Sequence, residues 1–173
     1  MLAINFNKFL NILIGEKMKK SLLIFSIVAI IFTACGGGDK KESLNSDSQK
    51  EKMAKIFGLT VFELENGIGP IKEKIRLGPI DSKNVAEGKK LFEAKCSQCH
   101  KFDEKYTGPA LRNVTKRRTP EYILNNILNP DEMANKHPEA KKLVALHATK
   151  MTFQNVTKED ALKILDYFRS EEK

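Results

Sequence analysis

The second half of the sequence predicts an all-α fold of about four helices in a small domain. Apolar residues recur at helical spacing in its last segment, at Ala161, Ile164, Leu165 and Phe168. Residues that commonly start helices precede this segment and the apolar segments before it. A domain of fewer than about 100 residues buries only a modest core, so we expect a bound group to supply further apolar surface.

Each of the four helices is placed by the residues that start it. Asn84 and Glu87 have the spacing of a cap for a helix from residue 85 to about 95, with Leu91 and Phe92 on its core face. The remaining helices begin at Thr119-Pro120, at Pro138 and at Thr157 with Asp160, and the first of these three ends near Asn129-Pro130.

Five consecutive residues, Cys96-Ser97-Gln98-Cys99-His100, follow the first helix. The pattern C-x-x-C-H is the attachment site of a c-type haem, in which both thiols add to the haem vinyl groups. One short turn carries the two sulfurs to one edge of the macrocycle, and His100 presents an imidazole nitrogen to the iron. The motif therefore predicts one covalently bound haem c and one-electron chemistry.

The cysteine pair has two other possible uses. A zinc site needs two more ligands, and the remaining cysteine, Cys35, lies far upstream in an apolar segment. His137 and His147 are ten residues apart, which is not a familiar zinc spacing. A thiol–disulfide redox pair is expected near a β-α-β pattern, which the surrounding sequence does not show. Haem is the favoured interpretation, and the thiol pair and the metal site stay open as alternatives.

The N-terminal segment predicts export from the cytoplasm. Lys19 and Lys20 precede an apolar run over residues 22–32, and Thr33-Ala34-Cys35 follows it. The run is shorter than the roughly 20 residues of a membrane-spanning helix. The segment resembles a bacterial lipoprotein signal, which implies that Cys35 is the lipidated first residue of a periplasmic protein anchored to a membrane. Met18 is the expected true start of the chain.

The net charge of the full chain is +8, and removing the four lysines and one glutamate of residues 1–34 leaves about +5. A mild basic excess suits docking to acidic proteins or anionic headgroups. We expect no nucleic acid as a partner, because the aromatic residues have core-like spacing and are not interleaved with the basic ones. Two cysteines for haem and one for lipid leave none for a disulfide.

Composition divides the chain into a signal at 1–34, a flexible tether at 35–52, an ordered extension at 53–80 and the haem domain at 81–173. Within the extension, Thr60 and Glu63 have capping-box spacing, and Gly67 is placed to end a short helix. The extension either packs on or links to the domain, and an irregular connector is the equal alternative.

Residues 81–169 resemble a class I cytochrome c. The run from Gly88 to Lys95 followed by C-S-Q-C-H resembles that family's first helix and haem motif, and Gly108-Pro109-Ala110-Leu111 resembles its G-P-x-L segment. The resemblance implies that Gly88 permits a close crossing with the last helix. It also implies that the carbonyl of Pro109 accepts the second ring proton of the haem-ligating histidine, and that Leu111 lies against the haem.

The resemblance also implies the remaining haem contacts. The sixth iron ligand is expected at Met151, in the loop before the last helix, although Thr152 replaces the proline that usually follows. His147 is the competing ligand. Arg117 and Tyr122 match the positions that hold the haem propionates, although the chain has no tryptophan.

Two residues are expected to have no part in the site: Met133 and His137 are interpreted as loop or surface residues.

We therefore expect an electron carrier, not an enzyme, that shuttles single electrons between respiratory partners through a haem with one histidine and one methionine ligand. A terminal oxidase, a nitrogen-oxide reductase or a quinol-oxidising complex would each serve as a partner. The first alternative is a haem-based ligand sensor or weak peroxidase, which needs a labile sixth ligand. The second is a lipoprotein that handles copper or exchanges thiols.

Overall fold

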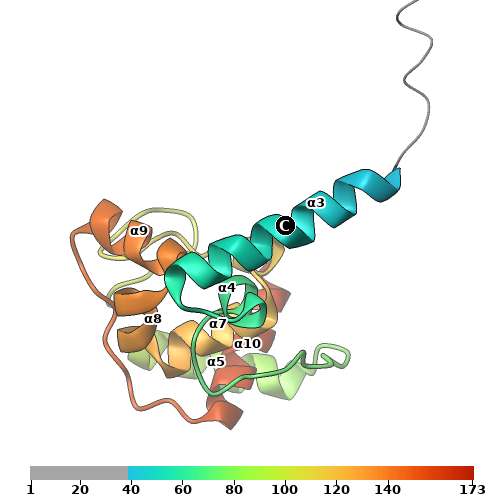
Figure 1. The fold of residues 1–173 in the computed structure, drawn as a ribbon. Coiled ribbons are helices and arrows are strands. Elements are labelled where there is room, and N and C mark those ends of the chain that lie inside the picture. Colours follow the sequence, from blue (N-terminus) through green and yellow to red (C-terminus); the bar gives the residue numbers. More distant parts are fainter. Residues whose placement is uncertain (1–38) are drawn as a thin grey trace, which may run out of the picture. The chain divides into compact units, whose positions relative to one another are not determined.

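The structure, a computed structural model, describes residues 39–173, and its side chains are described from residue 46 onward. The predicted signal over residues 1–34, the start at Met18 and the lipidation site Cys35 lie outside the described residues. The elements run in the order α3 (Asp39–Phe57), α4 (Val61–Asn66), α5 (Ser82–Lys95), α6 (Val114–Arg117), α7 (Pro120–Leu128), α8 (Pro130–Lys136), α9 (Pro138–His147) and α10 (Lys158–Ser170) (Figure 1). Residues 39–173 contain helices and no strand, which confirms the predicted fold class.

Most of the predicted helix starts are confirmed. The side-chain oxygens of Thr119 and Thr157 accept backbone N–H groups at the starts of α7 and α10. Thr60 and Glu63 form both bonds of a capping box, each 3.1 Å long, and Gly67 ends α4 with a φ of 80°.

The start of α5 differs from the prediction. Asp81, not Asn84, is its N-cap, because a carboxylate oxygen of Asp81 accepts the N–H of Lys83 at 2.8 Å. Asn84 lies inside the helix and donates to Asp166 of α10. The sequence pattern also missed α8, in which Pro130 occupies the first helical turn and so starts a new helix where the preceding one ends.

The predicted flexible tether at 35–52 also differs from the structure, which has helix α3 from Asp39 onward. Lysine, glutamate, glutamine, alanine and methionine make up much of this segment, and all are good helix formers. Lys50 lies 2.7 Å from a carboxylate oxygen of Glu65 in α4, so charge pairing links α3 to the next helix.

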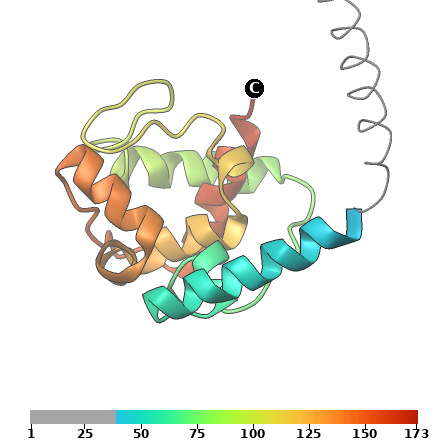
Figure 2. The ribbon, with the colours of Figure 1, turned by 45° about the horizontal axis from the view of Figure 1, so that its top comes forward.

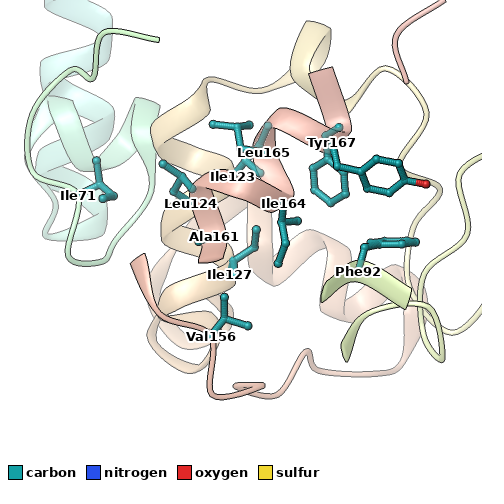
Figure 3. Close-up of a cluster of buried hydrophobic side chains, with 11 residues drawn as sticks. Ile71, Phe92, Ile123, Leu124, Ile127, Val156, Ala161, Ile164, Leu165 and Tyr167 are labelled. Atoms are coloured by element: carbon teal, nitrogen blue, oxygen red, sulfur yellow. The ribbon is translucent and has the colours of Figure 1, made fainter. Parts of the chain in front are cut away.

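The main core lies where α5 and α10 cross (Figure 2). Gly88 lies at this crossing, and a Cβ atom added there would be only 2.0 Å from the carbonyl oxygen of Lys163. Ile164 and Leu165 of α10 are fully buried, and Phe92 of α5 packs tilted against Tyr167 at 5.7 Å between ring centroids (Figure 3). The structure thus shows the close helix crossing that the resemblance implied.

A strap, which we define as residues 67–75 after α4, lies along α7. Asn125 of α7 is fully buried, and its side-chain oxygen accepts the N–H of Ile71 at 2.9 Å. Its amide nitrogen is placed to donate to the carbonyls of Ile71, Asn66 and Gly67, at 3.0 to 3.2 Å. The side chain of Asn125 therefore supplies hydrogen bonds that the backbone of the strap would otherwise make within a helix or a sheet.

Met133 and His137 are both fully buried, so their interpretation as loop or surface residues was wrong. The sulfur of Met133 accepts the N–H of Ile68 at 3.0 Å. His137 Nε2 donates to the carbonyl of Leu64 at 3.1 Å, while Nδ1 accepts the N–H of Glu139. Both side chains hold the N-terminal extension to α8 and α9, and their polar atoms have backbone partners that a sequence pattern does not reveal.

Replacing Gly88 by alanine tests the helix crossing. Because the new methyl would overlap the α10 backbone, we expect Gly88→Ala to lower the free energy of unfolding by about 1–3 kcal/mol, measured by chemical denaturation of the haem-loaded protein. Gly78→Ala is the matched control, since a Cβ there meets nothing within 4 Å. Equal stability of the two variants would contradict the close crossing.

The burial of His137 predicts a pH dependence of stability. Burial lowers the pKa of its imidazole in the folded protein, although Glu139 and the carbonyl partners oppose the effect. The unfolded chain therefore binds the proton more readily than the folded protein does. The contribution of His137 to the free energy of unfolding is present above a pH of about 6.5 and is lost as the pH falls through the lower pKa of the folded protein.

His137→Gln keeps an amide donor near Leu64 and removes the titration. We expect its free energy of unfolding, measured at intervals from pH 7.5 to 5, to fall less steeply with acid than that of the unmodified protein. Parallel slopes would refute the role assigned to His137.

Candidate functional site

The C-x-x-C-H segment forms one tight turn at the end of α5. The backbone N–H groups of Cys99 and His100 both donate to the carbonyl of Cys96, at 3.0 and 2.9 Å. The two thiols are not joined to each other, and Cys96 is half-buried while Cys99 is exposed. Burial raises the pKa of the Cys96 thiol to about 11. The turn thus holds two thiols and one imidazole together, as attachment of a macrocycle requires.

His100 is fixed by the segment that follows it. Its Nδ1 lies 3.1 Å from the carbonyl oxygen of Pro109, and since a carbonyl only accepts, Nδ1 carries the proton. Nε2 is therefore left with the free lone pair of a metal ligand. Burial lowers the pKa of this imidazole, which further favours the neutral, ligating form. Pro109 occupies the place that the resemblance implied for it.

Gly108 lies against the flat face of this imidazole. A Cβ atom at Gly108 would be 2.4 Å from Cε1 and 2.7 Å from Nδ1 of His100. The absence of a side chain here therefore lets the backbone carry Pro109 to its hydrogen bond.

A cavity of about 280 Å³ opens beside His100. Every residue predicted to contact the haem lines it: Cys96, Cys99, His100, Pro109, Leu111, Arg117, Tyr122 and Met151. They come from the end of α5, the segment after it, α6, α7 and the loop between α9 and α10. The structure therefore brings together residues that are up to 55 positions apart in the sequence.

Met151 lies in the loop between α9 and α10, and Met133 and His137 are not among the cavity-lining residues. Two lysines brace this loop. Lys150 Nζ is 2.8 Å from a carboxylate oxygen of Asp131 in α8, and Lys95 Nζ donates to the carbonyl of Gln154 at 2.9 Å. These contacts restrain a loop in which Thr152 stands where the resembling family usually has proline.

Two buried polar atoms in the cavity wall have no hydrogen-bond partner among the described residues: the Tyr122 hydroxyl and Nδ1 of His147. Buried polar groups are nearly always paired, so both atoms favour a polar ligand group within reach. The hydroxyl of Tyr122 is a suitable donor to a haem propionate, as the resemblance implied. Burial raises the pKa of this hydroxyl, which keeps it protonated.

Basic side chains lie beside Tyr122. The guanidinium of Arg118 stacks over the Tyr122 ring at 4.9 Å from its centroid and pairs with Glu139 at 3.2 Å. Arg117 is exposed and donates to the carbonyls of Ala110 and Arg112. The tyrosine and the two arginines together make this end of the cavity suited to anions, while much of the remaining wall is apolar. Thiols at one edge, an imidazole lone pair, apolar walls and an anion-binding end fit a haem c.

Sequence reasoning missed two residues of this site. Asn126 of α7 lines the cavity, and its amide nitrogen lies 3.4 Å from the sulfur of Met151. Arg118 stacks on Tyr122 at the other end. A signal was present for Asn126, because it is an amide on a helix face that otherwise carries Ile123 and Ile127 toward the cavity. For Arg118 the run Lys116-Arg117-Arg118 did not indicate which side chain turns inward.

Comparison with known proteins agrees with the site's fit to a haem c. Residues 85–172 match the sequence model of the family described as cytochrome c. A cytochrome c of Euglena viridis is 38% identical over 100 residues, which cover 50% of this chain and 96% of that protein. A solved cytochrome c of Rhodothermus marinus is 45% identical, covers 62% of this chain and 93% of its own, and superposes with a TM-score of 0.59. An engineered form of it is 44% identical, over 62% of this chain and 94% of its own, with a TM-score of 0.58. These matches imply one covalently bound haem c with its iron.

The contact between Gly108 and His100 predicts the effect of adding a methyl group there. In Gly108→Ala the imidazole must shift and its bond to Pro109 weakens, so we expect the free energy of unfolding to fall by about 1–3 kcal/mol. The denaturant midpoint at which the low-spin haem spectrum is lost should fall with it. Thr107→Ser, a conservative change at a neighbouring cavity residue, is the control and should leave that midpoint in place. A midpoint unchanged in Gly108→Ala would show that the ring has room to move.

Proposed function

The chain belongs to the cytochrome c family, and we propose that it is a membrane-tethered carrier of single electrons whose haem iron is held by His100 and Met151. The observation that carries the proposal is that these two side chains, 51 positions apart, line one cavity with both cysteines of the attachment motif. Proteins of this family are electron carriers, and their covalently bound haem c supplies the iron that is alternately reduced and oxidised.

The side chains of this chain have separate roles in the proposal. Cys96 and Cys99 would form the thioether bonds to the haem, and Nε2 of His100 would bind the iron because Nδ1 is committed to Pro109. The sulfur of Met151 would be the second protein ligand of the iron. A thioether is a soft ligand that favours the ferrous iron, so this pair of ligands gives a high reduction potential.

The fold limits structural change between the two redox states. His100 is fixed by Pro109 and Gly108, and the Met151 loop is braced by lysines on both sides. Ligands that are held independently of the iron keep their positions when its charge changes. The apolar cavity wall also excludes water from the reacting centre. Both features favour fast electron exchange.

We propose that redox partners dock where exposed apolar residues adjoin the cavity lining. Tyr106, Leu146 and Phe153 are exposed, and each is next in sequence to a cavity-lining residue. Lys101 and Lys105 lie in the same region and steer acidic partners toward it. A terminal oxidase, a nitrogen-oxide reductase and a quinol-oxidising complex each fit this requirement.

We also propose that the chain is exported and held at a bacterial membrane, facing the periplasm, by lipid on Cys35. The support is the sequence of residues 18–35, with its lysines, short apolar run and small residues before the cysteine. Between residues 39 and 173, no helix has the length and apolar character needed to cross a membrane.

A haem-based ligand sensor or weak peroxidase, the runner-up function, requires a sixth ligand that leaves easily. The braced Met151 loop favours the carrier over this alternative. His147 lines the same cavity four residues before Met151, so a second histidine ligand in place of the thioether is the competitor that the test must separate.

Met151→Ala tests the proposal directly. In the unmodified ferric protein, loaded with haem by the c-type maturation machinery, we expect the weak far-red absorption band of methionine–iron ligation. In Met151→Ala this band should be lost and the reduction potential should fall, because the soft ligand is gone.

His147→Ala is the matched control and should keep both the band and the potential. Loss of low-spin character in His147→Ala, with none in Met151→Ala, would establish ligation by two histidines and overturn the assignment. A chain that acquires no covalent haem during maturation would refute the carrier function itself.

A further inference from the structure

The last turns of helix α3 carry a row of apolar side chains that face away from the haem domain. Met53, Ile56 and Phe57 are all exposed, Ile56 by as much as 72%. They are three and four positions apart, so they lie on one face of the helix. We call these three residues the α3 stripe. Single exposed apolar residues are ordinary, whereas a contiguous row indicates a contact surface.

The rotation of α3 is fixed by its other face. Ala54 is buried, and its carbonyl accepts the N–H of Leu59 at 2.9 Å. The N–H of Gly58 donates to the carbonyl of Lys55 at 3.2 Å, and Gly58 has the positive φ, 66°, that this Schellman motif needs. The salt bridge from Lys50 to α4 fastens the same side. Because Ala54 is held inward, the α3 stripe stays exposed.

We propose that the α3 stripe inserts into the headgroup region of the bilayer to which lipid on Cys35 would anchor the chain, and so orients the haem domain at the membrane surface. The proposal rests on the proposed lipidation of Cys35. It assigns to the N-terminal extension a membrane-binding role in addition to its contacts with α7 and α8.

The length of the chain keeps the α3 stripe within reach of the bilayer. Residues 36–52 separate Cys35 from Met53. Such a segment spans about 27 Å as a helix and no more than about 60 Å when fully extended. Lipid at Cys35 would therefore confine the stripe to a thin layer above the surface. At the high effective concentration that results, weak insertion is enough to hold it there.

The charges around the α3 stripe suit anionic headgroups. Lys52 is exposed and lies four positions before Ile56, so it borders the stripe. The salt bridges of α3 within the described residues involve Lys50, and neither Lys52 nor Lys55. Exposed Glu51 lies on the opposite side of the helix from the stripe. Apolar residues bordered by lysine are typical of helices that bind at a bilayer surface.

The size of the α3 stripe favours a bilayer over a second copy of the chain. Each partner in a stable protein interface contributes roughly 800 Å². Three side chains, none of them fully exposed, cover far less than this area. Insertion into a bilayer has no such minimum, because each apolar side chain that leaves water contributes separately.

Contact with the bilayer through the α3 stripe would not cover the haem site. The lining of the cavity begins at Lys95, so none of its residues belongs to α3, α4 or the strap. Tyr106, Leu146 and Phe153, where we propose that partners dock, also lie outside the extension. All but one of the exposed large apolar residues in the described chain, Ile80, belong to one of these two sets. A carrier that is held at a membrane and docks on a partner needs two such surfaces.

Spin labelling tests the proposal in the full chain, loaded with haem, lipidated and reconstituted into vesicles of phosphatidylethanolamine and phosphatidylglycerol. Lipid on Cys35 and haem on the C-x-x-C-H pair would leave the cysteine of Ile56→Cys as the thiol that takes the label. The control is Ser48→Cys, because Ser48 is exposed on another face of α3. We expect the label at 56 to collide severalfold less often with a water-soluble nickel chelate than the label at 48. It should collide more often with oxygen, which concentrates in the bilayer.

A charge within the α3 stripe should lift it from the bilayer. With the label at Met53→Cys, a second change, Ile56→Asp, should raise the nickel collisions to the level of the Ser48→Cys label. Ile56→Val is the matched control and should leave them low. Since Ile56 is largely exposed, both variants should keep the denaturation midpoint of the haem-loaded protein. Low nickel collisions that persist in Ile56→Asp would contradict insertion.

The outcomes also distinguish this inference from the proposed tether. Flotation with the vesicles and the mass of the N-terminal peptide report whether Cys35 carries lipid. A lipidated chain that floats, with equal nickel collisions at 48 and 56, would overturn the membrane contact and leave the tether in place. Dipolar broadening of the Ile56→Cys spectrum would show two copies paired through the stripe and would also overturn it. A chain without lipid that does not float would refute the tether, and this inference with it.

Discussion

The structure depends on the contact between α5 and α10 at Gly88, where the helix backbones approach too closely for any side chain. A Cβ at this position would lie 2.0 Å from the carbonyl oxygen of Lys163. The crossing brings Phe92 against Tyr167 and Phe168, and Phe102, just beyond the C-x-x-C-H turn, joins the same aromatic group. Because the turn begins at Cys96, directly after the last residue of α5, the angle of this crossing sets where the two thiols and the imidazole face the cavity.

Helix α7 is the second organising element, because it contacts the strap on one side and lines the cavity on the other. Its face toward the strap carries Asn125, and its face toward the cavity carries Tyr122 and Asn126. Tyr122 also meets the buried ring of His137 edge-on at 5.2 Å between centroids, so the wall of the haem cavity is continuous with the residues that hold the extension. The strap and the haem cavity are therefore linked through one short helix.

Features that depend on residues close together in the sequence could be predicted, whereas features that depend on residues far apart could not. The helix caps at Thr60, Thr119 and Thr157 depend on residues three positions away, so the sequence was enough to predict them. The haem motif is equally local. Met133 and His137 were misjudged because their partners, Ile68 and Leu64, lie 65 and 73 positions earlier and are backbone groups, which no residue pattern marks. The contact of Asn126 with Met151 was missed because the two side chains lie 25 positions apart in different elements, although an amide on an otherwise apolar helix face marked Asn126. Met151 itself was placed in the cavity wall through a family resemblance, and periodicity alone would not have singled it out.

The extension addresses a problem that follows from the size of the haem domain. A domain this small buries a modest core, and Met151, the proposed iron ligand, lies in the loop between α9 and α10. In the proposed ligation, the bond from Met151 to the iron would be the haem's link to that loop. The strap adds a second buried cluster, which consists of Ile68, Tyr122, Met133 and Ala140. This cluster packs behind α7 and α8, the helices that the Met151 loop contacts. The strap packs behind α7 and α8, and none of its residues is among those that line the cavity. An electron carrier needs both a fixed ligand set and an open edge, and placing the restraint on the far side of these helices satisfies the two requirements together.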